Sequence, residues 1–273
     1  YVGHASPDPL VIDFGILRTA PPELNIAGIG DLFSMHTASH DWAYAQTKGK
    51  SEYPFSPEAI ERAQKILQML YGLLGEIRDN TDKGLMAIVE GYIDLNTICL
   101  PAGHFRVEEG SEHYLFYELE ERLKRPFVHG YIVGLGIYLM SQLQQNRFDF
   151  IREAMDEVAL PYNPSILDIS RDDLIDSLLN LRAYVATRPK LWYTVINDSA
   201  FVYYGSGSVW SEYGSLVSSG SFTIGAGSFG LQTGTVSGVL TFDDAVMAVH
   251  DEVAGKDTPF ILKEDAAACL ITT

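Results

Sequence analysis

The sequence predicts a mainly α-helical fold, a helical bundle over residues 1–198, followed by a β-rich C-terminal extension over residues 199–273. In the first part, apolar residues recur at the three- and four-residue spacing of a helix face. In the second part, glycine, serine and threonine are interleaved with Val, Phe, Ile and Leu, which favours short strands and turns. The change of texture near residue 199 therefore predicts a domain boundary.

The helices are predicted from their starts and from their periodicity. The clearest one covers 56–79, where Ser56 suits the N-cap, Pro57 the first helical position and Glu58 the first turn. The pair Pro21-Pro22 introduces a helix at about 24–47, after a short extended piece at 10–13. Further helices are predicted at about 81–98, 108–124, 128–145, 147–158 and 170–186.

The sequence also predicts the secondary structure of three segments outside these helices. Residues 192–196 are predicted to be extended, and residues 243–254 to form an apolar helical piece. Residues 225–230 match the pattern Gly-x-Gly-x-x-Gly, but a dinucleotide-binding turn needs a helix directly after it, and residues 231–238 are poor helix formers. We therefore interpret 225–230 as a glycine-rich β segment.

Composition excludes some classes of partner. The chain has 273 residues, of which 47% are hydrophobic and 20% charged, so it can bury a sizeable core. Its formal net charge of −17 argues against nucleic acid and against an anionic membrane surface, because both are bound through Lys and Arg. Because no run of eighteen apolar residues occurs, we expect no membrane span.

The cysteines and the N-terminus bear on the compartment. Cys99 and Cys269 are far apart in apolar surroundings, so no disulfide framework or thiolate metal motif is expected. This favours a reducing, cytoplasmic location. The first residues do not have the pattern of a signal peptide. Because the chain begins without methionine, we expect that sequence upstream of it was removed.

Three residues are the candidate metal ligands: Asp31, His113 and His129. Asp31 follows Gly28-Ile29-Gly30, and His129 precedes Gly130, so a ligand or another backbone can approach closely. One carboxylate and two imidazoles leave coordination positions open, as in a catalytic site. Taken singly, each of the three is more readily interpreted as an ordinary polar group than as a ligand.

Other polar residues are candidates for supporting roles. Tyr117 lies four residues after His113, on the same helix face, and its hydroxyl is the candidate catalytic proton donor. His104 and Arg106 are candidate substrate-binding residues for an anion, with solvation as the alternative. His36 and His40 have the spacing of a metal pair, but we interpret them as groups on the helix surface or beside the site.

Several motifs, in this order and spacing, resemble the C-terminal helical domain of the iron-containing alcohol dehydrogenase superfamily, in its glycerol-1-phosphate dehydrogenase branch. The motifs are Ala20–Leu32, Thr37–Trp42, Gly110–His113 and His129–Gly130. The resemblance implies the helical bundle of the dehydroquinate synthase-like type. It also implies Zn²⁺ or Fe²⁺, with Ni²⁺ left open, bound by Asp31, His113 and His129. The family reaction is hydride transfer between NAD(P) and an alcohol carbon.

The chain departs from this family in two ways. The family normally has a second histidine where Tyr117 stands, and a tyrosine holds its proton far more tightly. The family's N-terminal nucleotide-binding domain has no counterpart here, so NAD(P) is expected only from a missing domain or a partner subunit. We also expect an oligomer. A weaker likeness links Ser221–Gly234 to part of a lipid-binding SYLF domain.

The leading hypothesis is a metal-dependent oxidoreductase, or the metal-binding half of one, acting on a small molecule for which an anion such as a phosphate is a candidate. The first alternative is a non-catalytic partner or scaffold subunit derived from such an enzyme. The second is a metal-dependent lyase or synthase of the dehydroquinate synthase type.

Overall fold

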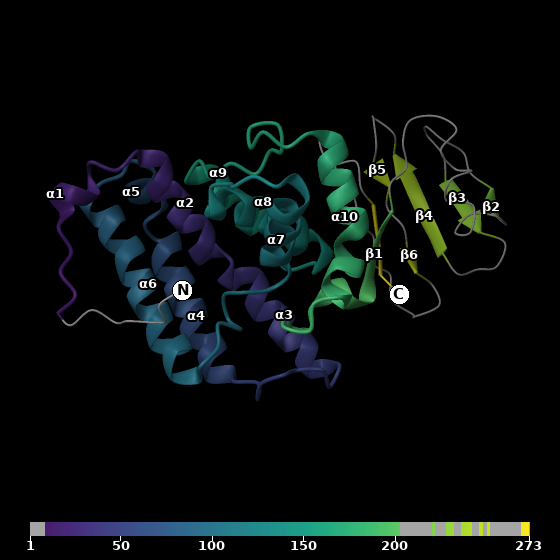
Figure 1. Ribbon diagram of the computed structural model, residues 1–273, viewed down its shortest axis with the longest axis horizontal. Helices are drawn as coiled ribbons and strands as arrows, with labels where there is room; N and C mark the ends of the chain where they lie inside the picture. The colour runs from purple at the N-terminus through teal and green to yellow at the C-terminus, as the bar shows by residue number, and fades with distance from the viewer. Residues whose placement is uncertain are drawn as a thin grey trace.

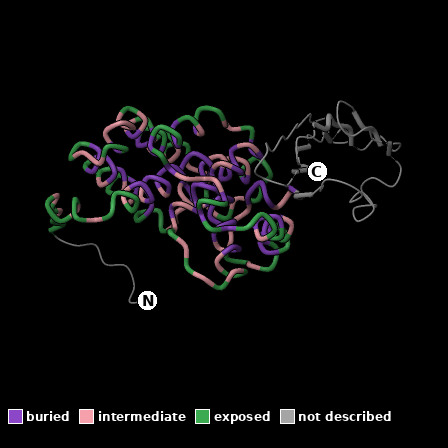
Figure 2. The backbone as a smooth tube through the Cα atoms, turned by 90° about the horizontal axis from the view of Figure 1, so that it is seen from above, coloured by how far each residue is buried: buried purple, intermediate pink, exposed green. Residues whose placement is uncertain are grey.

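The computed structural model describes residues 9–202 and, beyond them, the short strand segments 220–221, 228–231, 236–241, 246–247, 250–251 and 269–272. The described chain as far as residue 198 is mainly α-helical, as the sequence predicts (Figure 1). Its buried residues run through the inside of the helical body (Figure 2) and form a hydrophobic core. The proposed boundary near residue 199 stays a prediction.

The helices are α1 (Phe14–Leu17), α2 (Pro22–Phe33), α3 (Met35–Thr47), α4 (Pro57–Tyr71), α5 (Leu74–Arg78), α6 (Asp82–Ala102), α7 (Ser111–Leu123), α8 (His129–Leu143), α9 (Phe148–Glu157), α10 (Arg171–Ala186) and the 3-10 helix η1 (Val195–Asp198). Helix α8 is central and packs against α2 and α7, and α10 covers α7. Helix α6 packs against α4 and α5.

Two predicted helices are interrupted. The predicted helix 24–47 is two helices, α2 and α3, which meet at Ser34. The Ser34 hydroxyl lies 2.6 Å from the carbonyl oxygens of both Asp31 and Glu108, so a long-range contact that no local pattern shows fixes the junction. The predicted helix 56–79 begins with the expected Ser56 cap but stops at Tyr71, and α5 follows. Gly72 lies at this break and disfavours a continuous helix.

Other helix boundaries also differ from the prediction. Helix α6 continues to Ala102 and ends at Gly103, whose φ of +72° is the left-handed conformation that glycine adopts at helix ends. Helix α7 starts at Ser111, so 108–110 are outside it. Val195 and Ile196, predicted to be extended, belong to η1 because Thr194 and Asn197 form a capping box that starts a helical turn.

Helix α6 is, within the described residues, long and apolar enough to cross a membrane by length and composition. Its inward face packs against α2, α4 and α5. The buried residues on that face are Gly84, Leu85, Ala87, Ile88, Gly91, Leu95, Ile98 and Cys99. Helix α6 is thus a partly buried helix of the core.

The strands are β1 (Ser199–Val202), β2 (Gly220–Ser221), β3 (Ser228–Leu231), β4 (Val236–Thr241), β5 (Val246–Met247), β6 (His250–Asp251) and β7 (Cys269–Thr272). Strand β1 pairs with β7, and β4 pairs with β3, β5 and β6, all antiparallel. The helix predicted at 243–254 is wrong where β5 and β6 stand, because pairing with β4 overrides the local apolar pattern. Residues 228–230 of the glycine pattern belong to β3, whereas residues 225–227 and most of the SYLF-like stretch lie outside the described residues.

Candidate metal centre

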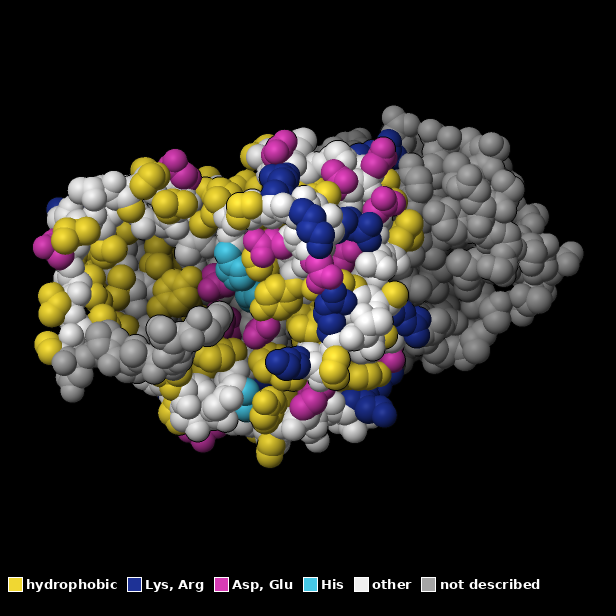
Figure 3. Space-filling view, viewed as in Figure 1, with side chains coloured by type: hydrophobic (Ala, Val, Ile, Leu, Met, Phe, Trp, Pro, Cys, Tyr) yellow, Lys and Arg dark blue, Asp and Glu magenta, His cyan; other side chains and the backbone are white. Residues whose placement is uncertain are grey.

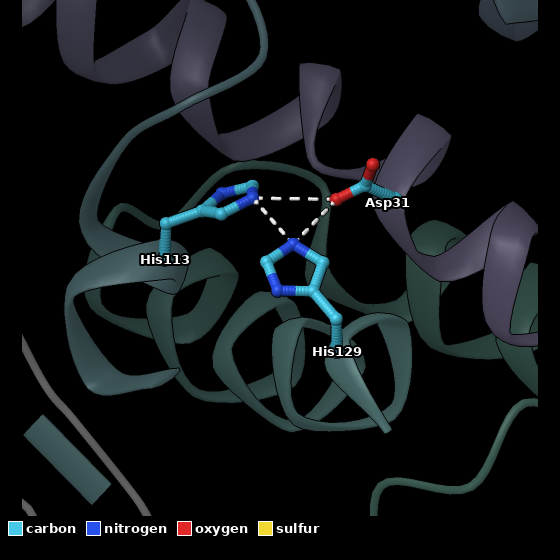
Figure 4. A group of neighbouring side chains, drawn as sticks. All are labelled: Asp31, His113 and His129. Atoms are coloured by element: carbon cyan, nitrogen blue, oxygen red, sulfur yellow. Dashed lines mark hydrogen bonds and ion pairs between the residues drawn. The ribbon is translucent and has the colours of Figure 1, made fainter. Parts of the chain in front are cut away.

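The side chains of Asp31, His113 and His129 meet in one place (Figure 4). Asp31 comes from the last turn of α2, His113 from the first turn of α7, and His129 is the first residue of α8. Asp31 Oδ1 lies 3.3 Å from His113 Nε2 and 2.9 Å from His129 Nε2, and the two Nε2 atoms are 3.2 Å apart. We call these three residues the ligand triangle.

Two glycines bring α2 and α8 together beside the triangle. A Cβ atom added at Gly30 would lie 2.1 Å from the Gly130 carbonyl oxygen, and one added at Gly130 would lie 1.7 Å from that of Ala27. The two helices therefore touch backbone to backbone, which only residues without a side chain permit. Because Asp31 follows Gly30 and His129 precedes Gly130, this crossing sets the distance between the two ligands.

The orientation of His113 is fixed by the residue before it. His113 Nδ1 lies 2.9 Å from Glu112 Oε1, which also accepts a hydrogen bond of 2.6 Å from the backbone N–H of Gly110. Glu112 is fully buried. With the proton on Nδ1 and directed to this carboxylate, the lone pair of Nε2 faces the triangle, which is the arrangement that metal-binding histidines use.

The electrostatics of the triangle favour a cation. Burial by itself raises the pKa of Asp31, but hydrogen bonds to His113 and His129 outweigh it and hold that pKa well below its usual value. Burial lowers the pKa of His113, yet Asp31 and Glu112 together raise it well above its ordinary value. Negative charge thus dominates around His113. The Tyr92 hydroxyl donates to the Gly28 carbonyl at 2.8 Å and lies 3.3 Å from Asp31 Oδ2.

The triangle is accessible from one side. The His113 side chain is only 5% exposed, whereas that of His129 is 42% exposed. Histidine side chains reach the surface of the molecule beside acidic ones in the space-filling view (Figure 3). A small molecule can therefore approach the triangle past His129.

The distances fit a metal ion. Ligand atoms at about 2.0–2.1 Å from a tetrahedral zinc ion lie about 3.3–3.4 Å from one another. The three separations of 2.9, 3.2 and 3.3 Å are close to these values. Two imidazoles and one carboxylate suit Zn²⁺ or Fe²⁺ and leave at least one coordination position for another ligand.

Glu108 is a residue of this corner that the sequence interpretation missed. Its backbone carbonyl lies 2.6 Å from the Ser34 hydroxyl, at the junction of α2 and α3 beside Asp31. Burial first, and the charge of Asp31 second, raise the pKa of Glu108 to about 8. The available signal was the acidic pair Glu108-Glu109 directly before Gly110. A pair of acidic residues in a loop is usually solvated, so that signal was weak.

Tyr117 lies beside the triangle but does not contact its ligand atoms. Its ring centroid is 6.2 Å from that of His113, as the four-residue spacing predicts. Its hydroxyl donates to Glu109 Oε1 at 2.6 Å. Burial, followed by the charge of Glu109, raises the pKa of Tyr117 above its ordinary value. Its catalytic role stays a prediction.

His104 and Arg106 make their contacts elsewhere. His104 stacks on Tyr53 with the ring centroids 4.1 Å apart. The Arg106 guanidinium is fully buried, donates to the Tyr193 carbonyl and lies 3.8 Å from the Glu52 carboxylate. The alternative that Arg106 is solvated is therefore wrong, while the substrate-binding role of both residues stays a prediction.

The pair His36 and His40 does not form part of the triangle. His36 is buried, and its Nε2 donates to the Asn146 carbonyl at 2.6 Å. Burial lowers the pKa of His36 to about 4 and lowers that of His40 as well. Of the two interpretations for His36, a surface position is therefore wrong, and its contact ties α3 to the residues after α8.

Comparison with known proteins gives distant relatives. A glycerol-1-phosphate dehydrogenase [NAD(P)+] of Pyrococcus horikoshii is 30% identical over 172 residues, which are 63% of this chain and 49% of that protein. The enzyme of the same name from Methanobrevibacter smithii is 29% identical over 196 residues, 72% of this chain and 54% of its own. The chain thus spans about half the length of the curated relatives it matches. No family model matches the chain.

Proposed function

We propose that this chain is the metal- and substrate-binding half of an NAD(P)-dependent dehydrogenase related to the glycerol-1-phosphate dehydrogenases. The single observation that carries the proposal is the ligand triangle, in which one carboxylate and two imidazoles from three helices lie within 3.3 Å of one another. The helical fold and the distant similarity support it. We further propose that residues 1–198 form a bundle of the dehydroquinate synthase-like type, with 199–273 as an extension.

The proposed chemistry assigns a role to each part of the site. A bound Zn²⁺ or Fe²⁺ ion supplies a Lewis acid that polarises the alcohol or carbonyl oxygen of a small substrate. Asp31, His113 and His129 hold the ion, and Glu112 keeps His113 in orientation. Tyr117, hydrogen-bonded to Glu109, is the proposed proton donor at the edge of the site.

The nucleotide is proposed to come from outside the described residues. The relatives are named as NAD(P)+ enzymes, and this chain spans about half of their length. We therefore propose that a further segment or a partner subunit supplies the nucleotide-binding half, within an oligomer in the cytoplasm. The buried free thiol of Cys99 fits a reducing compartment.

The experiment that tests the proposal is metal analysis of the purified protein. We expect about one Zn, Fe or Ni ion per chain, since the triangle forms one centre. His113→Ala and His129→Ala should lose it, while the matched variant His40→Gln, on α3, should keep it. Full metal content in both alanine variants would contradict the proposal.

A second measurement separates the dehydrogenase from the alternatives. The departure at Tyr117 and the half-length match favour, as a second candidate, a scaffold subunit derived from such an enzyme. NAD(P) binding should be measured by calorimetry with the chain alone and with candidate partner proteins. Binding that appears only with a partner supports the dehydrogenase, whereas metal without nucleotide in every combination favours the scaffold. A lyase would turn over its substrate without net oxidation of NAD(P).

A further inference from the structure

The Asp31 carboxylate divides its two oxygens between different partners. Oδ1 lies 2.9 Å from His129 Nε2 and 3.3 Å from His113 Nε2, whereas Oδ2 points away from the histidines (Figure 4). The Tyr92 hydroxyl lies 3.3 Å from Oδ2. We propose that Tyr92 is a positioning residue of the metal centre, which holds Oδ2 away so that Asp31 binds the ion through Oδ1 alone. This inference rests on the proposed metal site and concerns its coordination.

The fold fixes the place of the Tyr92 hydroxyl. Tyr92 belongs to α6, which packs against α2, and its ring packs on the hydrophobic core. The hydroxyl lies 2.8 Å from the Gly28 carbonyl oxygen, three residues before Asp31 on the same helix. Positions three apart share a helix face, so one hydroxyl reaches both oxygens. It therefore lies between a fixed backbone oxygen and the carboxylate of a ligand.

The hydrogen of this hydroxyl has two possible acceptors. A tyrosine hydroxyl carries one hydrogen, for which the Gly28 carbonyl and Asp31 Oδ2 compete. The Gly28 carbonyl lies within α2, whose backbone also supplies an N–H donor. Hydrogen bonds to a charged acceptor are stronger than those to a neutral one. Since ligating carboxylates are themselves hydrogen-bonded by outer partners, we assign the hydrogen to Oδ2 when Oδ1 binds the ion.

A carboxylate that binds through one oxygen keeps a coordination position open. Asp31 Oδ1 and the two Nε2 atoms of His113 and His129 make three ligand atoms, so the fourth tetrahedral position stays free for a substrate oxygen. If Oδ2 also bound, it would fill that position or raise the coordination number with substrate to five. Tyr92 thus keeps the ion accessible to substrate, although its own hydroxyl is not a ligand.

The test compares Co²⁺ binding by wild type and Tyr92→Phe. The metal-free proteins are titrated with Co²⁺ against a competing chelator, and the visible spectrum of each loaded form is recorded. Tyr92→Phe should bind Co²⁺ about 10- to 100-fold more weakly. Its visible bands should weaken, because Co²⁺ with four ligand atoms absorbs more strongly than Co²⁺ with five. A wild-type spectrum in Tyr92→Phe would overturn the inference whatever the affinity.

Two other tyrosines provide matched controls. The Tyr131 hydroxyl donates to the Glu23 carbonyl of α2 at 2.7 Å, so Tyr131→Phe removes a bond to the same helix that does not involve a ligand. The buried Tyr71 hydroxyl has no hydrogen-bond partner within the described part of the chain, so Tyr71→Phe removes a hydroxyl alone. Both variants should keep the wild-type affinity and spectrum. Equal changes in Tyr131→Phe and Tyr92→Phe would overturn the inference, because loss of a backbone contact to α2 would then explain both.

His113→Ala separates this inference from the proposed function. If His113→Ala loses Co²⁺ while Tyr92→Phe has the wild-type spectrum, the metal site stands and only the role of Tyr92 fails. If His113→Ala keeps full affinity, the proposed function fails as well. Circular dichroism checks that each variant is folded.

Discussion

Two aspartates on consecutive helices, Asp31 on α2 and Asp41 on α3, have opposite kinds of partner. The Asp41 carboxylate is fully buried and accepts backbone N–H bonds from Ser111 at 2.8 Å and from Val195 at 3.0 Å. The Asp31 carboxylate faces two imidazoles. The backbone N–H groups that bond Asp41 are held by the fold, whereas the imidazole nitrogens that bond Asp31 can bind a metal ion instead. The type of partner, more than the degree of burial, therefore separates a structural carboxylate from a ligand.

The largest effect on folding is expected at Asp41. Asp41→Ala leaves the N–H groups of Ser111 and Val195 buried without acceptors and should lower the free energy of unfolding by about 3 kcal/mol or more. Urea unfolding of the metal-free protein measures this. Asp41→Asn keeps one acceptor oxygen and should lose less. A loss of unfolding free energy below about 1 kcal/mol in Asp41→Ala would contradict the structural role of Asp41.

Asp31 should show the reverse behaviour. Asp31→Asn is expected to weaken Zn²⁺ binding by more than the roughly 10- to 100-fold that loss of an outer partner costs, because a direct ligand is removed. The free energy of unfolding of the metal-free protein should fall by less than in Asp41→Ala, since Asn still bonds an imidazole. Chelator competition and urea unfolding give the two values. If Asp31→Asn lowers the free energy of unfolding as much as Asp41→Ala does, Asp31 has a structural role like that of Asp41.

His36 is a further structural residue, and its contribution to the free energy of unfolding depends on pH. It binds a backbone carbonyl, as Asp41 binds backbone amides, and burial lowers its pKa from 6.5 to about 4. Between these values the unfolded chain takes up the proton and the folded one does not, so stability falls as the pH falls. From pH 7 to pH 5 this loss is about 2 kcal/mol for the one group.

His36→Gln is the variant that isolates this contribution. Glutamine retains an N–H donor for the Asn146 carbonyl but does not titrate, so the fall in unfolding free energy between pH 7 and pH 5 should shrink by about 2 kcal/mol. Urea unfolding at several pH values measures it. An identical pH slope in the two proteins would show that His36 does not contribute.

The smallest effects on stability and metal affinity are expected at Tyr117, which is neither a buried structural residue like Asp41 nor a proposed ligand like Asp31. Tyr117→Phe removes the hydroxyl that donates to Glu109 and should cost about 1 kcal/mol of unfolding free energy. The affinity for Zn²⁺ should change by less than about 3-fold, because the hydroxyl does not contact a ligand atom. A tenfold loss of affinity would instead assign Tyr117 to the metal centre.

The sequence predicted the metal corner better than its surroundings. Asp31, His113 and His129 came from short motifs with a family resemblance, and the structure brings all three together. The glycines beside Asp31 and His129 indicated a close approach, which the crossing of α2 and α8 confirms. These features are local in sequence, so a single chain displays them.

The features that sequence reasoning missed depend on contacts between distant residues. The break at Ser34 is fixed by the Glu108 carbonyl, 74 residues away. The role of Asp41 depends on Val195, 154 residues away. Arg106 was a candidate for binding an anionic substrate, with solvation as the alternative, but it is enclosed by residues that follow α10. Helical periodicity gives the faces of helices and not the loops that cover them.

The close contact between the backbones at Gly30 and Gly130 helps to set the separation between the ligands Asp31 and His129. Because no side chain lies between the two backbones, direct backbone contact sets how closely the segments that carry Asp31 and His129 approach each other. Two glycines that supply no ligand atom thus help to set the spacing of two ligands.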